Sequence, residues 1–252
     1  MTRRPRILFG EHSTQRPAIE RLVDHDRFDV AFAAFDGADF APFDLVVPLR
    51  LEEFAAARRA NADRRRAVLP SPELVALCDD KLLFNRRLIA LGFGDAIPAL
   101  LPDDTDAYPF VRKVRRGDFG AGIRMVRGAG DDAPVPDSFA QVAVAGTDEY
   151  VLHLLRVDAA VRYSLCYRYD MGDPLAIRGG AQGARGIHPA DPEPARATCL
   201  AILDALGFEG TCCFNYKLEA DRPMILELNP RFGGSLVGDV TGYVAAHLDA
   251  IA

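Results

Sequence analysis

Residues 225–235 read Ile-Leu-Glu-Leu-Asn-Pro-Arg-Phe-Gly-Gly-Ser, and the interpretation of the chain starts from them. The first half of this stretch predicts a buried apolar strand that ends in polar residues. Side chains alternate between the two faces of a strand, so Glu227 and Asn229 are expected on the same face. A carboxylate is costly to bury without a partner. This favours a ligand-binding role for Glu227 over that of an ordinary strand end.

The residue types at this strand end fit a site for magnesium and phosphate. Mg²⁺ prefers oxygen ligands, usually one or two carboxylates together with substrate phosphates. Glu227 and the amide oxygen of Asn229 supply such a pair, and Arg231 can stabilise a phosphoryl group during its transfer.

A second signal is a strand followed by a glycine-containing turn. Residues 110–123 predict a strand that carries Lys113 and then a turn that contains Gly117, Gly120 and Gly122. Successive N–H groups in such a turn can bind phosphate oxygens. The spacing is that of neither a Walker loop nor a Rossmann loop. Taken alone, the turn also fits an ordinary hairpin.

A third signal is Lys81, which lies in the first turn of a predicted helix. Only three of the thirty basic residues are lysine, so each lysine stands out. A cation at the start of a helix opposes the helix dipole, and an anionic ligand nearby would explain it. Taken alone, Lys81 also fits an ordinary exposed lysine.

The first seventy residues predict a small α/β unit. Short apolar runs at 7–9, 28–32 and 45–47 are separated by short links, with a helical pattern between the first two. This order predicts a parallel sheet. Ser71 then predicts a helix cap, with Pro72 at the first helical position.

After residue 71 the pattern changes to one dominated by strands. The expected elements are a helix over 80–91, strands between 110 and 177, a helix capped by Asp191, a hairpin of strands over 210–218 and 224–228, and a C-terminal helix over 243–252.

Taken in this order, the motifs resemble the ATP-grasp superfamily of carboxylate–amine ligases. The matching order is Asp-Lys at the start of a helix, a strand lysine before a glycine loop, a hinge strand, and Glu-x-Asn-Pro-Arg, within residues 71–235. The resemblance implies an α/β (α+β) protein with the ATP-grasp fold. A small parallel α/β pre-ATP-grasp domain would cover residues 1–70. An ATP-grasp domain would cover residues 71–252, with two α+β lobes gripping ATP and the lid-bearing subdomain at roughly 95–152.

The resemblance also implies roles for individual residues. Lys81 and Lys113 would contact the phosphates of ATP beneath a mobile lid over residues 117–122. Arg231 and Lys113 would be catalytic. The metal, Mg²⁺ or alternatively Mn²⁺, is expected at Glu227 and Asn229. The superfamily often has a third ligand on the preceding strand, where Asn215 and Lys217 share one face. Asn215 could ligate a metal, whereas the protonated amine of Lys217 cannot and could instead contact a phosphate or the acyl substrate. A hinge strand whose backbone meets adenine is expected at Glu149, Tyr150, Val151, Leu152, His153 and Leu155, although the superfamily often has Glu or Gln at the position of His153.

Substrate-binding residues are expected in two glycine-containing segments. The loop over residues 178–188 also fits an ordinary surface loop, and the turn after Arg231 follows the metal site directly. The candidates are Arg178, Arg185, His188, Lys217, Gly233, Gly234 and Ser235.

Composition excludes several other classes of function. The net charge is −6, which argues against non-specific nucleic-acid binding. No apolar run is long enough to span a membrane. The five cysteines contain no C-x-x-C motif, which favours buried thiols in a reducing cytoplasm. We therefore expect a cytoplasmic protein without nucleic-acid or membrane partners.

The expected activity is that of an ATP-dependent ligase with a small-molecule carboxylate and an amine as substrates. The carboxylate would attack the γ-phosphate of ATP, and the amine would then displace phosphate from the acylphosphate. A carboxylate–thiol ligase, an ATP-grasp kinase and a catalytically silent nucleotide-binding protein are the alternatives. Dimerisation is common in the superfamily, so a homodimer is an option.

Overall fold

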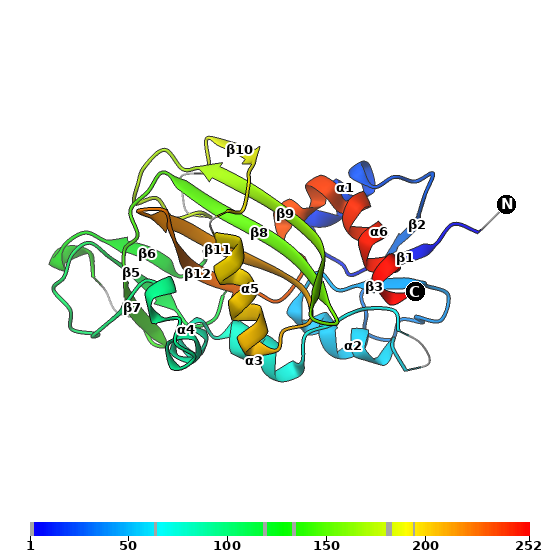
Figure 1. The fold of residues 1–252 in the computed structure, drawn as a ribbon, viewed down its shortest axis with the longest axis horizontal. Helices are drawn as coiled ribbons and strands as arrows, with labels where there is room; N and C mark the ends of the chain where they lie inside the picture. Colours follow the sequence, from blue (N-terminus) through cyan, green and yellow to red (C-terminus); the bar gives the residue numbers. More distant parts are fainter. Residues whose placement is uncertain (1–2, 63–64, 118–119, 133–134, 180–182, 194) are drawn as a thin grey trace.

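The computed structural model describes residues 3–62, 65–117, 120–132, 135–179, 183–193 and 195–252. Its strands form three sheets that follow one another along the long axis of the molecule (Figure 1). The three-stranded sheet lies at one end, the five-stranded sheet in the centre and the four-stranded sheet at the other end. The expected mixed α/β architecture is confirmed.

The N-terminal sheet is parallel, as the short apolar runs predict. Its strands are β1 (Arg6–Phe9), β2 (Asp29–Phe32) and β3 (Leu45–Val47), in the order β2-β1-β3. Helix α1 (Gln15–Leu22) lies between β1 and β2 in the chain and supplies the crossover connection that two parallel strands need. Two short helical segments follow β3, η1 (Leu51–Glu53) and α2 (Phe54–Arg59).

The core of this N-terminal unit includes residues from the end of the chain. Helix α6 (Val240–Ile251) and the preceding turn η4 (Gly234–Asp239) pack against α1, and their buried side chains share one core cluster with those of β1. Phe232 and Tyr243 are buried in this core, and Phe232 contacts Phe9 edge-to-face with ring centroids 6.2 Å apart. The chain thus returns to the N-terminal sheet directly after the Glu-x-Asn-Pro-Arg segment.

The central sheet is antiparallel, in the order β10-β9-β8-β11-β12. Three helices cover one of its faces, and buried apolar side chains fill the space between them. The strands are β8 (Asp148–Val157), β9 (Ala160–Asp170), β10 (Gly186–Pro189), β11 (Gly210–Glu219) and β12 (Arg222–Asn229). The helices are α3 (Pro72–Asp79), α4 (Lys81–Ala90) and α5 (Ala195–Leu206).

The four-stranded sheet is also antiparallel, in the order β4-β7-β5-β6. Its core is small, with Phe110, Val126 and Ala140 buried together. The strands are β4 (Leu100–Leu101), β5 (Phe110–Val114), β6 (Ile123–Val126) and β7 (Ser138–Val142), and the short turns η2 (Gly94–Ala96) and η3 (Ala129–Asp131) accompany them.

Ser71 caps α3 as predicted. Its hydroxyl accepts the N–H of Leu74 at 3.2 Å, and Pro72 is the first residue of α3. The Asp191 carboxylate accepts the N–H of Glu193 at 3.1 Å, and the N–H of Arg196 donates to the Pro192 carbonyl at 3.0 Å. Helix α5 is described from Ala195 on, and residue 194 lies outside the described residues.

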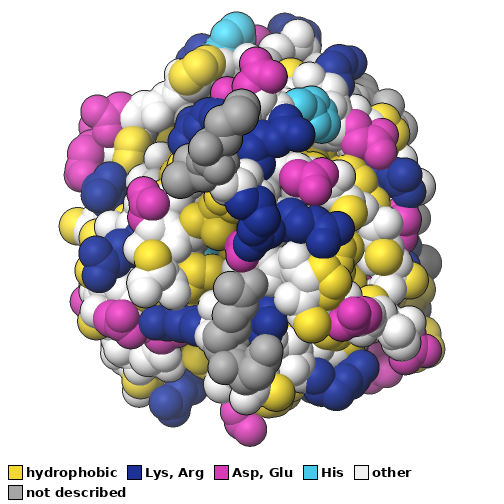
Figure 2. Space-filling model, turned by 90° about the vertical axis from the view of Figure 1, so that its right-hand side faces the viewer, with side chains coloured by type: hydrophobic (Ala, Val, Ile, Leu, Met, Phe, Trp, Pro, Cys, Tyr) yellow, Lys and Arg dark blue, Asp and Glu magenta, His cyan; other side chains and the backbone are white. Residues whose placement is uncertain are grey.

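Figure 2 shows the end of the molecule at which the N-terminal sheet lies. Basic and acidic side chains are interspersed on this face, with apolar side chains between them. No helix in the described part of the chain has the length and apolar character needed to cross a membrane.

Candidate active site

A cavity of about 290 Å³ lies between the five-stranded and four-stranded sheets. The four-stranded sheet contributes a mainly apolar wall with one lysine, and the central sheet contributes most of the polar groups. Alternation along each strand decides which residues face it. From β5 and β6 these are Val111, Lys113, Ile123 and Met125; from β8, β11 and β12 they are Glu149, Val151, His153, Cys213, Asn215, Lys217, Leu226, Glu227 and Asn229.

Three polar side chains converge on the cavity wall where β11 pairs with β12. The Asn215 amide donates a short hydrogen bond to Oε1 of Glu227, and the Asn229 amide donates to the same oxygen at 2.9 Å. Asn215 is 5% exposed, and its Oδ1 has no hydrogen-bond partner among the described residues. This side chain is therefore buried with an unsatisfied oxygen at the cavity.

A register shift in β12 places Leu226 beside these groups. Asn215 pairs with Glu227 and Tyr216 with Ile225, so Leu226 is the extra residue of a bulge. Its carbonyl accepts a hydrogen bond from Lys113 Nζ at 3.4 Å. The bulge thus connects the lysine of the four-stranded sheet with the strand that carries Glu227.

Lys113 is buried, with Glu227 and Lys81 near enough to influence its charge. Burial lowers its pKa to about 8, and Lys81 lowers it further, while Glu227 opposes the change. An anionic ligand in the cavity would favour the protonated ammonium.

This pKa leads to a prediction for ATP binding. A pKa near 8 leaves about one-tenth of Lys113 charged at pH 9, so the dissociation constant for ATP should rise up to about tenfold between pH 7 and pH 9. The measurement is a nucleotide titration at both pH values. The control is Lys113→Arg, whose guanidinium stays charged and should remove the pH dependence. An unchanged affinity in the wild type would contradict the prediction.

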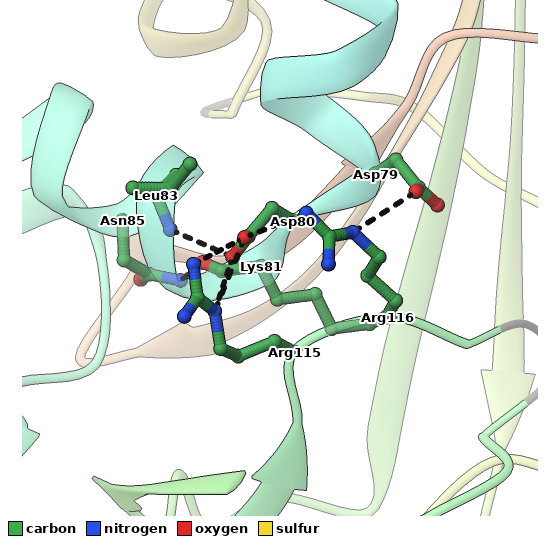
Figure 3. Close-up of polar contacts among 7 residues, drawn as sticks. All are labelled: Asp79, Asp80, Lys81, Leu83, Asn85, Arg115 and Arg116. Carbon is green, nitrogen blue, oxygen red and sulfur yellow. Dashed lines mark hydrogen bonds and ion pairs between the residues drawn. The ribbon is translucent and has the colours of Figure 1, made fainter. Parts of the chain in front are cut away.

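A cluster of charged side chains joins α4 to the end of β5 (Figure 3). The Asp80 carboxylate accepts the N–H of Leu83 at 3.1 Å, which caps α4, and pairs with Arg115 at 2.5 Å. Burial acts to raise the pKa of Asp80, but the hydrogen bonds and the arginine charges outweigh it and lower that pKa. The next residue, Lys81, donates from Nζ to the carbonyl of Gly117 at 2.5 Å.

Lys81 is therefore attached to the glycine loop and is absent from the cavity wall. Its backbone N–H also donates to the Arg115 carbonyl at 2.8 Å. The Asn85 amide donates to the Lys81 carbonyl at 2.6 Å, as Figure 3 shows. These contacts fix Lys81 at the base of the loop that carries Gly117.

We expect Asp80→Ala to destabilise the protein through this cluster. Loss of a helix cap costs about 1 kcal/mol, which corresponds to a fall in Tm of about 2–4 °C for a chain of this size. The matched control is Asp79→Ala, because Asp79 forms only an exposed pair with Arg116 at 3.6 Å. Thermal unfolding of both variants checks this, and equal Tm values would contradict the role of Asp80.

The glycine loop reaches the other side of the cavity. Gly117, Gly120 and Gly122 all have positive φ, at 144°, 74° and 70°. A Cβ on Gly120 would lie 2.5 Å from the carbonyl oxygen of Arg178, so the backbones meet closely there. Residues 118–119 of the expected lid lie outside the described residues.

Arg178 and Glu149 form an ion pair in the cavity wall. Arg178 Nε lies 2.6 Å from Oε1 of Glu149, and its guanidinium carbon lies 4.8 Å from the centre of the Tyr169 ring. The positive charge of Arg178 thereby balances the negative charge of Glu149.

The turn after β12 completes the cavity with Arg231, Gly233, Gly234 and Ser235. The Ser235 hydroxyl lies 2.8 Å from Nε2 of His153. His153 is fully buried, and burial, followed by the nearby charge of Arg178, lowers its pKa to about 3. His153 is therefore neutral at physiological pH, and its Nδ1 has no partner among the described residues.

The expectation that the β8 backbone meets adenine is wrong. Over residues 150–155 the strand is paired on one side with β9 and on the other with β11, which occupies its backbone groups within the sheet. Only its alternate side chains Glu149, Val151 and His153 reach the cavity. The other three point elsewhere: Tyr150 stacks on Tyr216, Leu152 lies in the core beneath the helices, and Leu155 lies in the core shared with the N-terminal sheet.

Three of the candidate substrate residues are not placed to bind a substrate in the cavity. Arg185 lies against Gly172, and His188 is exposed on β10, so neither lines the cavity. The Lys217 ammonium reaches the cavity wall but donates to the carbonyls of Val144, Gly146 and Pro174 at 3.3, 2.9 and 3.1 Å. Its three donors are therefore engaged by backbone, and it fastens the connection between the two sheets.

Three residues at or beside the cavity are not expected from the sequence pattern. Val142, the last residue of β7, and Val144, in the connection between β7 and β8, line the cavity, but in the sequence they look like ordinary apolar residues. Gln15, at the start of α1, is 3% exposed, and neither polar atom of its amide has a partner among the described residues. A Cβ on Gly234 would lie 4.0 Å from Gln15 Nε2, so this amide flanks the turn that follows β12.

The donor set at the β11–β12 pair fits a magnesium ion. Asn215 Oδ1 is a buried oxygen without a hydrogen-bond partner in the described part of the chain, and Oε2 of Glu227 takes no part in the contacts with the two amides. Within the described ranges, no group of three or more His, Cys, Asp and Glu side chains could hold a metal. A cation here would therefore need further oxygen ligands from a bound substrate, as Mg²⁺ commonly does.

The chain has the ATP-grasp fold, as comparison with solved structures shows. Phosphoribosylamine–glycine ligase from Thermotoga maritima is 16% identical, with a TM-score of 0.72 over 98% of this chain and 75% of that one. N5-carboxyaminoimidazole synthetase from Staphylococcus aureus, complexed with ADP, is 14% identical, with a TM-score of 0.66 over 98% and 77%.

D-alanine–D-alanine ligase from Bacillus anthracis, complexed with ATP, is similar over almost its whole length. It is 12% identical, with a TM-score of 0.63 over 99% of this chain and 97% of that one. No family model matches the sequence.

Proposed function

We propose that this protein is an ATP-dependent ligase that joins a carboxylate to an amine through an acylphosphate, releasing ADP and phosphate. The observation that carries the proposal is one cavity that combines the Asn215–Glu227–Asn229 cluster, Lys113 and Arg231. The ATP-grasp fold and its ligase neighbours support the same reaction class.

ATP would bind between the two sheets. Val142 at the end of β7, Val144 of the β7–β8 connection and Met125 of β6 offer an apolar surface for the adenine ring. This replaces the β8 backbone as the hinge. Nucleotide-binding residues would also include Lys113 and the glycine loop with Gly120, which meets the backbone of Arg178 on the opposite side.

Lys113 and Arg231 would stabilise the phosphoryl group during its transfer. Phosphoryl transfer depends mainly on positioning and charge stabilisation, and both side chains are buried cations in the cavity wall. Glu227, Asn229 and Asn215 would hold Mg²⁺, or Mn²⁺ in its place, which would supply Lewis-acid polarisation of the phosphate oxygens. Lys81 would act through the loop, by holding Gly117 at its base.

The acyl and amine substrates would occupy the part of the cavity beside Ser235. Gly233 and Gly234 keep this turn open, because a Cβ on Gly233 would collide with the His153 ring. The Ser235 hydroxyl would offer a hydrogen bond to substrate in the cavity, and the buried Gln15 amide lies beside Gly234 of the same turn. Closure of the glycine loop would keep water from the acylphosphate.

The test is phosphorus NMR of the protein with MgATP and a mixed pool of amino acids and small carboxylic acids. We expect ADP and inorganic phosphate that depend on the pool and are absent with Glu227→Gln. ADP with a new phosphorus signal and no inorganic phosphate would indicate a kinase instead. ATP binding without turnover under any pool would favour a silent nucleotide-binding protein.

A further inference from the structure

The proposed metal site contains a single carboxylate. Its three oxygen-bearing side chains are Glu227 and the neutral amides of Asn215 and Asn229. The site therefore brings one negative charge to a cation.

Glu227 is also restricted in how it can bind cations. Oε1 accepts hydrogen bonds from both amides, so its lone pairs are directed at N–H groups. Oε2 is the oxygen that these contacts leave for a metal. A carboxylate that binds two metal ions through separate oxygens needs both oxygens free of other contacts, and in two-metal sites the ions lie about 3.5–4 Å apart.

No other acidic side chain on the described cavity wall can take the place of a second ligand. Glu149 lies on β8, which is separated from β12 by β11, or about 9.5 Å at the usual strand spacing. It is also paired with Arg178 at 2.6 Å. The charge nearest Glu227 on the four-stranded sheet is the cation Lys113, whose Nζ hydrogen-bonds the neighbouring Leu226 carbonyl.

We propose that this site holds a single divalent cation together with the phosphates of ATP, and that Asn215 is the residue that prevents a second ion from binding. The inference rests on the proposed function, because ATP supplies the remaining ligands. A carboxylate at position 215 would face the cavity beside Glu227 and add the charge that a second dication requires.

The test uses Mn²⁺ with the non-hydrolysable analogue β,γ-methylene-ATP, observed by electron paramagnetic resonance. Two Mn²⁺ ions within about 4 Å couple magnetically and give a spectrum distinct from that of a single ion. For the wild type we expect one bound Mn²⁺ per bound nucleotide and an uncoupled spectrum. For Asn215→Asp we expect two ions per nucleotide and a coupled spectrum.

Asn215→Asp both removes an amide and adds a negative charge, whereas Asn215→Ala only removes the amide. The alanine variant therefore shows which of the two changes admits a second ion. It should still bind one uncoupled ion, with lower affinity, because one neutral oxygen ligand is gone. Two coupled ions in the wild type would overturn the proposal while leaving the ligase function intact, and so would a single ion in a folded Asn215→Asp variant. Bound nucleotide with no Mn²⁺ at all would instead contradict the metal site of the proposed function. The number of Mn²⁺ ions bound to the wild type tests the proposal of a single cation even where Asn215→Asp does not fold.

Discussion

Replacing Arg231 with alanine should reduce the rate of ADP formation by about 10²–10³-fold, which is typical for loss of one group that stabilises transition-state charge. Arg231 lies in the cavity wall and is 7% exposed, so its charge acts in a site with little water. The measurement is kcat for ADP release in the presence of the substrate pool. The dissociation constant for ATP should change much less than kcat, because the charge matters most during transfer.

Arg231→Lys is the informative companion variant. It keeps the positive charge but loses the planar, two-pronged donor geometry of arginine. We expect kcat between those of the wild type and Arg231→Ala. Thermal unfolding of both variants controls for the loss of packing around this buried side chain. A folded Arg231→Ala variant with wild-type kcat would exclude Arg231 from the chemistry.

Replacing Glu227 with glutamine should have an effect at least as large. The substitution preserves shape and leaves an oxygen that can accept from Asn215 and Asn229, so the fold should be retained. It removes the single negative charge of the metal site. Because a bound metal contributes several kcal/mol to charge stabilisation, we expect turnover to fall by more than about a hundredfold.

Metal affinity gives a second measure of the Glu227 variant. The dissociation constant for Mn²⁺ in the presence of β,γ-methylene-ATP should rise at least about tenfold, since a charged ligand becomes neutral. Glu149→Gln is the matched control, because Glu149 is the other carboxylate of the cavity and pairs with Arg178. It should leave Mn²⁺ affinity unchanged. An equal loss of Mn²⁺ affinity in the two variants would mean that the metal does not bind at Glu227.

Much of the fold could be predicted because local rules agree with the tertiary structure. The apolar runs at 7–9 and 45–47 form buried strands, and Ser71 and Pro72 start a helix as their types predict. Alternation placed Glu227 and Asn229 on one face, and both reach the cavity. These features depend on the period of a strand and on short-range hydrogen bonds, which a sequence records directly.

The errors concern features that depend on distant partners. The strand over 149–155 was expected to offer its backbone to a ligand, but β9 and β11 flank it on both sides, and pairing across a sheet is not visible in a single segment. Lys217 meets carbonyls from three positions between 144 and 174. The Gln15 amide lies beside Gly234 only because the end of the chain returns to the N-terminal sheet.

The proposed reaction has a direct isotopic test. If a carboxylate attacks ATP, one of its oxygens leaves with the phosphate when the amine displaces it. We would label the carboxylates of the substrate pool with ¹⁸O, supply MgATP, and examine the released phosphate by phosphorus NMR. Phosphate that contains one ¹⁸O atom is the predicted result. Unlabelled phosphate, released together with ADP, would contradict an acylphosphate and with it the account of this protein as a carboxylate–amine ligase.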